Sequence, residues 1–261
     1  MKIENTKKQL IVDFESWKTA FIEVDKKSKE DNGKSNWEEG RSACTLAKYF
    51  TTPNIEESYG IKKIEEYFKA LGFSNPKFEY AEIEHRSPFD KYKGGTRMQD
   101  LVIWGESEKG RILACIEAKV DEEFNELLNK AYGTAKQKFE KDPNSNAQKR
   151  IEELCDKYLN VSAESIKSGD ENNIRYQLLY YLAGSICEAK EYGNVVFMPI
   201  MVFKTDKYNE TEGERNRKDY ERFIKALDFE ECNKEKQIRK RTFENVDVYI
   251  SYIEIDFKTK E

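Results

Sequence analysis

The chain has a single histidine, His85, among 261 residues. This scarcity excludes a His-Glu-x-x-His zinc site, an HNH-type nuclease and any phosphoryl-transfer site that needs two histidines. The sequence also lacks a Gly-x-x-x-x-Gly-Lys-Ser/Thr loop for nucleotide phosphates and a Gly-x-Ser-x-Gly elbow for an acyl-transfer nucleophile. The chemistry that remains for an enzyme of this composition depends on carboxylates, lysine and a bound metal ion.

The cysteines are few, odd in number and far apart. None of the five stands in a Cys-x-x-Cys pair, so neither a disulfide framework nor a zinc knuckle is expected. Residues 1–14 lack the apolar core of a signal peptide, and the best apolar run, 195–203, is too short to span a bilayer. A soluble, cytoplasmic protein is therefore expected. The cysteines are Cys44, Cys115, Cys155, Cys187 and Cys232.

Charged residues make up 36% of the chain, against about 25% in an average protein. Because 50 acidic residues outnumber 45 basic ones, the net charge of −5 argues against a protein that coats nucleic acid by electrostatics alone. Two local groups of basic residues could still contact phosphates, or could simply lie on solvated helices, and both interpretations stay open. These groups are the run 234–241 and the scattered Lys136, Lys138, Lys141, Lys149 and Arg150.

Apolar periodicity predicts an α/β protein of one domain, residues 1–261, with a mixed central β-sheet flanked by helices. Residues 1–52 are expected to form a helical N-terminal extension, with helices over 10–24 and from Ser42 onward. Residues 206–261 are expected to add a helix over 216–227 and a strand over 246–257, whose shift of phase indicates a bulge. The remaining expected elements are helices over 53–72, 122–139, 147–159 and 174–192, strands over 77–84, 100–104, 112–120 and 195–203, and a loop over 85–96.

Two predicted strands joined by residues 105–110 carry the residues with chemical potential. Asp100 lies on the first strand of this hairpin, and Glu117-Ala118-Lys119 lies on the second. Because side chains alternate along a strand, Glu117 and Lys119 point to the same face, and Asp100 can lie close to them. Two carboxylates and an ammonium at the edge of an apolar sheet are costly unless a cation and an anionic substrate join them.

Magnesium prefers oxygen ligands, so Asp100, Glu117 and the carbonyl of Ala118 are predicted to bind Mg²⁺, and Mn²⁺ is expected to substitute for it. The ion would lower the pKa of a water molecule and neutralise transition-state charge, while Lys119 orients or deprotonates this nucleophile. A structural ion pair at a strand end is the competing interpretation. A second Glu-x-Lys, at 188–190, falls in a helical stretch and is expected on an exposed helix face.

The run Gln99-Asp100-Leu101-Val102-Ile103-Trp104, followed by Cys115-Ile116-Glu117-Ala118-Lys119-Val120, resembles the signature of the PD-(D/E)XK nuclease superfamily, which includes restriction and repair nucleases. Gln99 stands where the motif has its proline. Residues 117–124 and 174–179 are similar to a mostly uncharacterised bacterial group of restriction-endonuclease-like proteins. The resemblance covers roughly residues 36–205 and implies a nuclease-like core over 53–205 that hydrolyses phosphodiester bonds.

The resemblance also directs attention to four further residues. Glu65 lies on the helix before the strands, where the superfamily often has another acidic metal ligand, although a solvated helix face is the alternative. Glu123 could reach the metal or belong to a charge cluster at a helix N-terminus. Arg175 and Gln177 begin a later helix, where related nucleases use a polar residue near the phosphate or the water; simple surface roles are the alternative.

Two functions follow as expectations. The first is a magnesium-dependent endonuclease that acts on DNA, with RNA not separable by sequence. The second is a catalytically inactive nuclease-fold protein that serves as a nucleic-acid-binding or assembly module, which the acidic total charge slightly favours. A homodimer is expected because double-strand cutting usually calls for two active sites, and no membrane contact is expected. His85, in the predicted loop, could touch substrate or be incidental.

Overall fold

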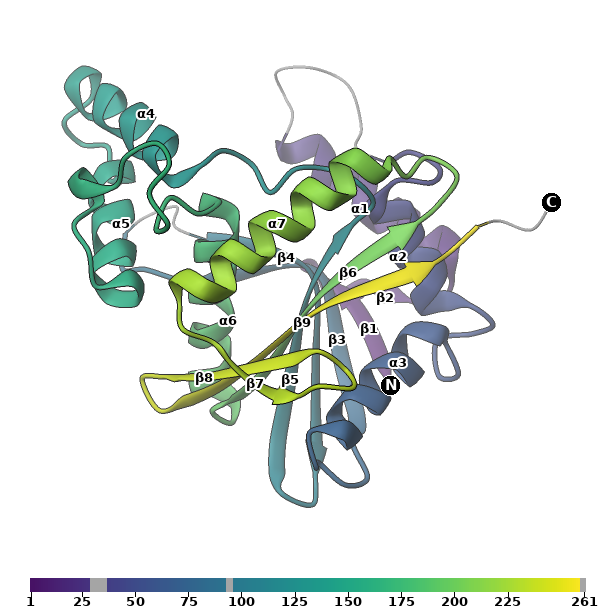
Figure 1. Cartoon of the computed structure of the whole chain (residues 1–261). Helices are drawn as coiled ribbons and strands as arrows, with labels where there is room; N and C mark the ends of the chain where they lie inside the picture. Colours follow the sequence, from purple (N-terminus) through teal and green to yellow (C-terminus); the bar gives the residue numbers. More distant parts are fainter. Residues whose placement is uncertain (29–36, 93–95, 259–261) are drawn as a thin grey trace.

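The computed structural model describes residues 1–28, 37–92 and 96–258, and these residues form three layers (Figure 1). Within the described residues, a sheet of nine strands in the order β2-β1-β3-β4-β5-β6-β9-β8-β7 makes the middle layer. Helices cover both of its faces. The predicted α/β class, with a mixed central sheet flanked by helices, is therefore confirmed.

The sheet combines an antiparallel meander with a parallel centre. Strands β3, β4 and β5 pair antiparallel in sequence order, whereas β5 pairs in parallel with β6, and β6 in parallel with β9. The central strands β5 and β6 are buried on both faces, as is typical of strands covered by helices on each side. The strands are β1 (Lys2–Asn5), β2 (Leu10–Ile11), β3 (Lys77–Pro88), β4 (Thr96–Ser107), β5 (Gly110–Lys119), β6 (Val195–Lys204), β7 (Glu230–Asn233), β8 (Ile238–Phe243) and β9 (Val246–Asp256).

Two hydrophobic clusters hold the layers together, one on each face of the sheet. The first cluster contains side chains of α4 to α7, and the second contains those of α1 to α3. Among the described residues, every helix is too short or too polar to cross a bilayer. The helices are α1 (Phe14–Ser28), α2 (Ser42–Thr51), α3 (Tyr59–Ala70), α4 (Leu128–Lys141), α5 (Ala147–Leu154), α6 (Tyr176–Tyr192) and α7 (Glu210–Ala226), with short turns η1 (Cys155–Leu159) and η2 (Ala163–Ser165).

The N-terminal residues differ from the predicted helical extension. β1 pairs antiparallel with β2 and in parallel with β3, so the segment belongs to the central sheet. Between β1 and β2 the side chain of Asn5 accepts hydrogen bonds from the amides of Lys7 and Gln9, both at 3.0 Å, and holds a tight turn. The helix predicted from Leu10 therefore begins at Phe14. Apolar residues in so short a stretch fit a strand as well as a helix.

Several predicted boundaries also change. β3 continues to Pro88 instead of ending at residue 84, and β8 occupies part of the basic run 234–241. Helix α7 begins at Glu210, not at Asn216, because the Asn209 side chain accepts from the amides of Thr211 and Glu212 and caps it earlier. The predicted bulge in the last strand is wrong, since β9 pairs with β6 without a break from Asp247 to Asp256. The apolar pattern changes phase because the middle of β9 is buried on both faces of the sheet.

His85 lies on β3 and not in a loop, and its ring contacts two carboxylates. Its Nε2 lies 2.9 Å from Glu188 of α6, and its Nδ1 lies 3.1 Å from Glu82. Burial would lower the pKa of His85, but the contacts with Glu188 and Glu82 outweigh it and raise this pKa to about 9. Glu188, predicted on an exposed helix face, is instead largely buried, because it joins α6 to β3.

Since the unfolded pKa of histidine is about 6.5, the stabilisation from charged His85 is complete below that pH and is lost as pH rises through about 9. We expect His85 to titrate near pH 9 in an NMR experiment, where the single histidine gives one unambiguous signal. The free energy of unfolding should fall by about 3 kcal/mol at most across that window. In Glu188→Gln the midpoint should move towards 6.5; a wild-type midpoint already near 6.5 would contradict the ion pair.

Candidate active site

Asp100 and Glu117 lie at neighbouring ends of β4 and β5. The last registered pair before the site is Leu101 opposite Ile116, so the next residues of the two strands are Asp100 and Glu117. The amide of Ala118 donates a hydrogen bond of 2.7 Å to Oδ2 of Asp100. The hairpin predicted from the sequence therefore forms, and it brings the two carboxylates together.

Glu117 is held by three donors from three elements. Nζ of Lys119 lies 3.0 Å from its Oε1, and Nε2 of Gln177 donates to the same oxygen at 2.6 Å. The other oxygen, Oε2, pairs with the guanidinium of Arg97. Glu117 is 1% exposed. Burial alone would raise its pKa, but Arg97 and Lys119 outweigh burial and lower it, so this carboxylate is ionised.

Asp100 has the opposite electrostatic situation. Burial and the neighbouring negative charge of Glu117 raise the pKa of Asp100 to about 7, although Arg97 and Lys119 oppose this shift. Arg97 and Lys119 therefore offset only part of the repulsion between the two neighbouring carboxylates, and Asp100 lines the cleft. A divalent cation between them would relieve their repulsion.

The oxygen donors at this point fit a hard cation such as Mg²⁺. The residues that would hold it are the predicted ones: the carboxylates of Asp100 and Glu117 and the carbonyl of Ala118. Among the described residues, no group of three or more histidine, cysteine, aspartate or glutamate side chains could hold a metal ion. A metal at this site would therefore rely on two carboxylates, one backbone oxygen and water molecules, as is usual for magnesium.

Strand alternation is interrupted where β3 and β4 reach the site. Glu84 on β3 has a φ of +50°, in the left-handed region, and the antiparallel register places it across from Asp100. Strict alternation would put Arg97 on the same face as Leu101. Instead Arg97 packs against α6, where a Cβ added to Gly184 would lie 3.1 Å from the Cβ of Arg97. The interruption turns Arg97 towards Glu117, and sequence spacing alone gives no signal for it.

A cleft of about 590 Å³ opens beside these residues. Four of the predicted site residues line it, namely Asp100, Lys119, Glu123 and Gln177, whereas Glu117 lies behind them. The opposite wall comes from the N-terminal elements, which the sequence did not connect with the site. Lining residues from that wall include Trp17, Phe21, Arg41, Ser42 and Leu46.

The N-terminal wall is bonded to the segment that follows β5. Nη1 of Arg41 pairs with Asp121 at 2.5 Å, and the amide of Ser42 donates to Glu122 at 3.2 Å. Glu122 also accepts from the amide of Val120 at 2.6 Å. The helix predicted over 122–139 therefore begins only at Leu128, because these side chains hold residues 121–125 as a loop.

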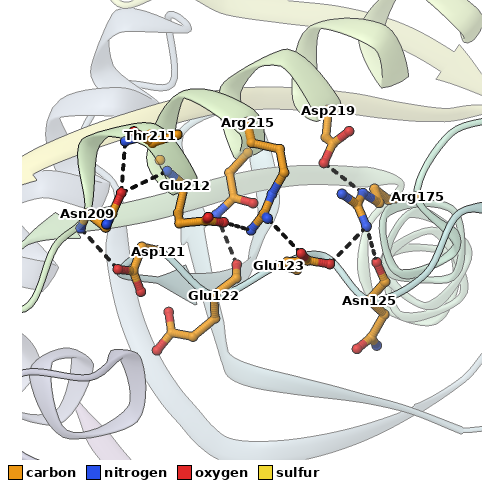
Figure 2. Close-up of polar contacts among 12 residues, drawn as sticks. Asp121, Glu122, Glu123, Asn125, Arg175, Asn209, Thr211, Glu212, Arg215 and Asp219 are labelled. Carbon is orange, nitrogen blue, oxygen red and sulfur yellow. Dashed lines mark hydrogen bonds and ion pairs between the residues drawn. The ribbon is translucent and has the colours of Figure 1, made fainter.

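Figure 2 shows that this loop is also tied to α6 and α7. Arg175, the residue before α6, pairs with Glu123 at 3.2 Å and with Asp219 of α7 at 2.7 Å. Arg215 of α7 approaches the same Glu123 at 2.6 Å. Glu123 is thus a partner of two arginines and not part of a helix N-terminus, and Arg175 serves to join three segments around the cleft.

Gln177 is oriented by the packing of α6. One turn after it, the buried hydroxyl of Tyr181 donates to the carbonyl of Cys115 at 2.6 Å and lies 3.3 Å from that of Pro199. These contacts fix α6 over β5 and β6, so that the Gln177 amide reaches Glu117. Tyr181 is fully buried and belongs to the core on this face of the sheet.

Glu65 is not brought to the site. It lies on α3, pairs with Lys69 at 3.5 Å, and is absent from the residues that line the cleft. Four of the five basic residues in the run 234–241 form ion pairs within the chain, as do two of the five in the scattered group, which weakens the interpretation that these residues contact phosphate. Their pairs are Lys136–Glu164, Arg150–Asp90, Lys236–Glu66, Arg239–Glu231, Lys240–Asp247 and Arg241–Asp228.

Replacing Arg175 with Met should lower the free energy of unfolding by about 2–4 kcal/mol, because Asp219 would be left largely buried without its cation. Urea unfolding measures the loss. As a control, Lys225→Met breaks an exposed pair with Glu171 and should cost less than about 1 kcal/mol. Equal losses in the two variants would show that Arg175 does not hold the segments together.

Neither a curated protein nor a solved structure matches the chain. A match does exist to the family described as Domain of unknown function (DUF6946), and it extends over residues 18–257, from α1 to the end of the last strand. The chain therefore belongs to the DUF6946 family.

Proposed function

We propose that this protein is a magnesium-dependent nuclease that hydrolyses phosphodiester bonds in nucleic acid, with DNA as its substrate. One observation carries the proposal: two carboxylates from adjacent strands and the ammonium of Lys119 meet beside a cleft, with Asp100 and Lys119 open to it. The resemblance of the segments around these residues to the PD-(D/E)XK signature supports the same chemistry.

Each residue of the site has a distinct task in this proposal. Asp100, Glu117 and the Ala118 carbonyl hold the cation, which when bound supplies Lewis-acid activation of water and neutralises charge on the phosphate. Lys119, fixed at 3.0 Å from Glu117, orients the attacking water and adds positive charge near the transition state. Gln177 keeps the Glu117 carboxylate in one orientation.

A nuclease-fold module without turnover is the second candidate, and one observation favours it. Both oxygens of Glu117 are already engaged by side chains of the chain itself, namely Arg97, Lys119 and Gln177. A carboxylate that is satisfied in this way has less need of a metal ion. The net charge of −5 also suits a protein whose partner is not bound by charge alone.

We also propose a cytoplasmic location and a homodimeric state. All five cysteines are free thiols, and three of them, Cys44, Cys115 and Cys155, are buried, which supports a reducing compartment such as the cytoplasm. A homodimer would supply the two active sites that double-strand cutting needs. Analytical ultracentrifugation of the protein, with and without DNA, tests whether it forms a dimer.

We expect purified protein to cleave plasmid or single-stranded DNA with Mg²⁺ or Mn²⁺, and Asp100→Asn and Lys119→Met each to lower the rate at least about 100-fold. RNA of matching sequence is assayed in parallel, because the sequence does not separate an RNA substrate from a DNA substrate. Glu65→Gln, on the surface of α3, is the matched control and should retain the wild-type rate.

Circular dichroism establishes that each variant is folded, and calorimetry with Mn²⁺ separates the two candidates. If the wild type binds Mn²⁺ and cleaves nucleic acid, and Asp100→Asn keeps the wild-type rate, the assigned site is contradicted. Folded wild-type protein that neither binds Mn²⁺ nor cleaves either nucleic acid would contradict the nuclease and favour the module.

A further inference from the structure

Arg97 contacts the candidate metal ligand Glu117, and the proposed chemistry gives it no task. It is 8% exposed, and its guanidinium pairs with the still more deeply buried Glu117. The guanidinium carbon lies 5.2 Å from the ring centre of Tyr180 and 5.9 Å from that of Tyr181. With Gly184 leaving room beside its Cβ, Arg97 occupies a slot shaped for a planar cation.

This placement is costly for stability alone. Desolvating both members of a buried ion pair costs several kcal/mol per ion, and apolar residues of similar volume often serve as well or better. Nε of Arg97 is also buried and has no hydrogen-bond acceptor among the described residues, which adds a further penalty. A buried cation kept at such cost beside a candidate metal ligand points to a role in the site itself.

Charge and geometry suggest what that role is. Glu117 is contacted by two cations, the guanidinium of Arg97 and the ammonium of Lys119. In two-metal hydrolytic sites, ions about 3.5–4 Å apart share bridging carboxylates. Here Oε2 of Glu117 is taken by Arg97, Oε1 contacts Lys119 and Gln177, and Asp100 lines the cleft beside them.

We propose that Arg97 is a built-in counter-ion that takes the place of a second metal ion, so that the site binds a single divalent cation. This inference rests on the proposed metal-dependent function and narrows it to one-ion chemistry. Arg97 is then a positioning residue: it holds Glu117 ionised and in place, and it repels a second dication from the same carboxylate.

Mn²⁺ binding to the full chain tests the inference without reference to activity. Calorimetry should give one ion per wild-type chain, and the EPR spectrum of bound Mn²⁺ should lack the coupling of two close ions. In Arg97→Met the ratio should rise from one to two with coupled ions, whereas Arg97→Lys, which keeps the charge, should stay at one.

Arg150→Met is the matched control. Arg150 also forms a largely buried pair with an aspartate, Asp90, lies 5.6 Å from the ring centre of Phe89, and does not line the cleft. It should lose stability to a similar degree but keep one ion. Circular dichroism and thermal melting establish the fold of each variant.

The outcomes separate this inference from the function on which it rests. One ion in both wild type and folded Arg97→Met would overturn the role of Arg97 and leave the nuclease intact. Two coupled ions in the wild type would overturn it even if Arg97→Met does not fold. No bound ion in the wild type would remove the proposed function as well.

Discussion

The ionised carboxylate of Glu117, buried between β5 and α6, is the constraint on which the site depends. A charge in that position is tolerable only because Arg97, Lys119 and Gln177 reach it from β4, β5 and α6. Those three elements must therefore keep their relative positions for the contacts with Glu117 to persist. The hydroxyl of Tyr181, bonded to the backbone of β5, supplies one of the contacts that do so.

The cleft beside this carboxylate is assembled from parts distant in the chain. Loop 121–125 is tied to Arg41 and Ser42 on one side and to Arg175 and Arg215 on the other. Because these contacts are charged and several are partly buried, they fix the loop more firmly than its backbone alone would. The N-terminal helices thereby become one wall of the candidate active site, and the first strands become part of the sheet that supports it.

The hairpin with Asp100, Glu117 and Lys119 was predictable because it depends on local rules. A turn of a few residues sets the pairing of two strands, and alternation then decides which side chains share a face. Arg97 could not be found by the same reasoning, since the left-handed backbone at Glu84 interrupts strand alternation beside β4 and Arg97 packs against Gly184 of α6. Glu65 was a candidate through resemblance alone, and the helix that carries it turns this side chain towards Lys69.

What the sequence determined by itself was the α/β class, the sheet with helices on both faces, and the approach of two carboxylates and a lysine on one hairpin. Periodicity and strand alternation extend over a few residues, and the chain shows them directly. Only the tertiary structure decided that β1 joins β3, that the Arg97 guanidinium neutralises Glu117, and that α1 and α2 face the site. Such contacts join residues twenty to more than a hundred positions apart, where packing and charge in three dimensions, and not local pattern, select the partner.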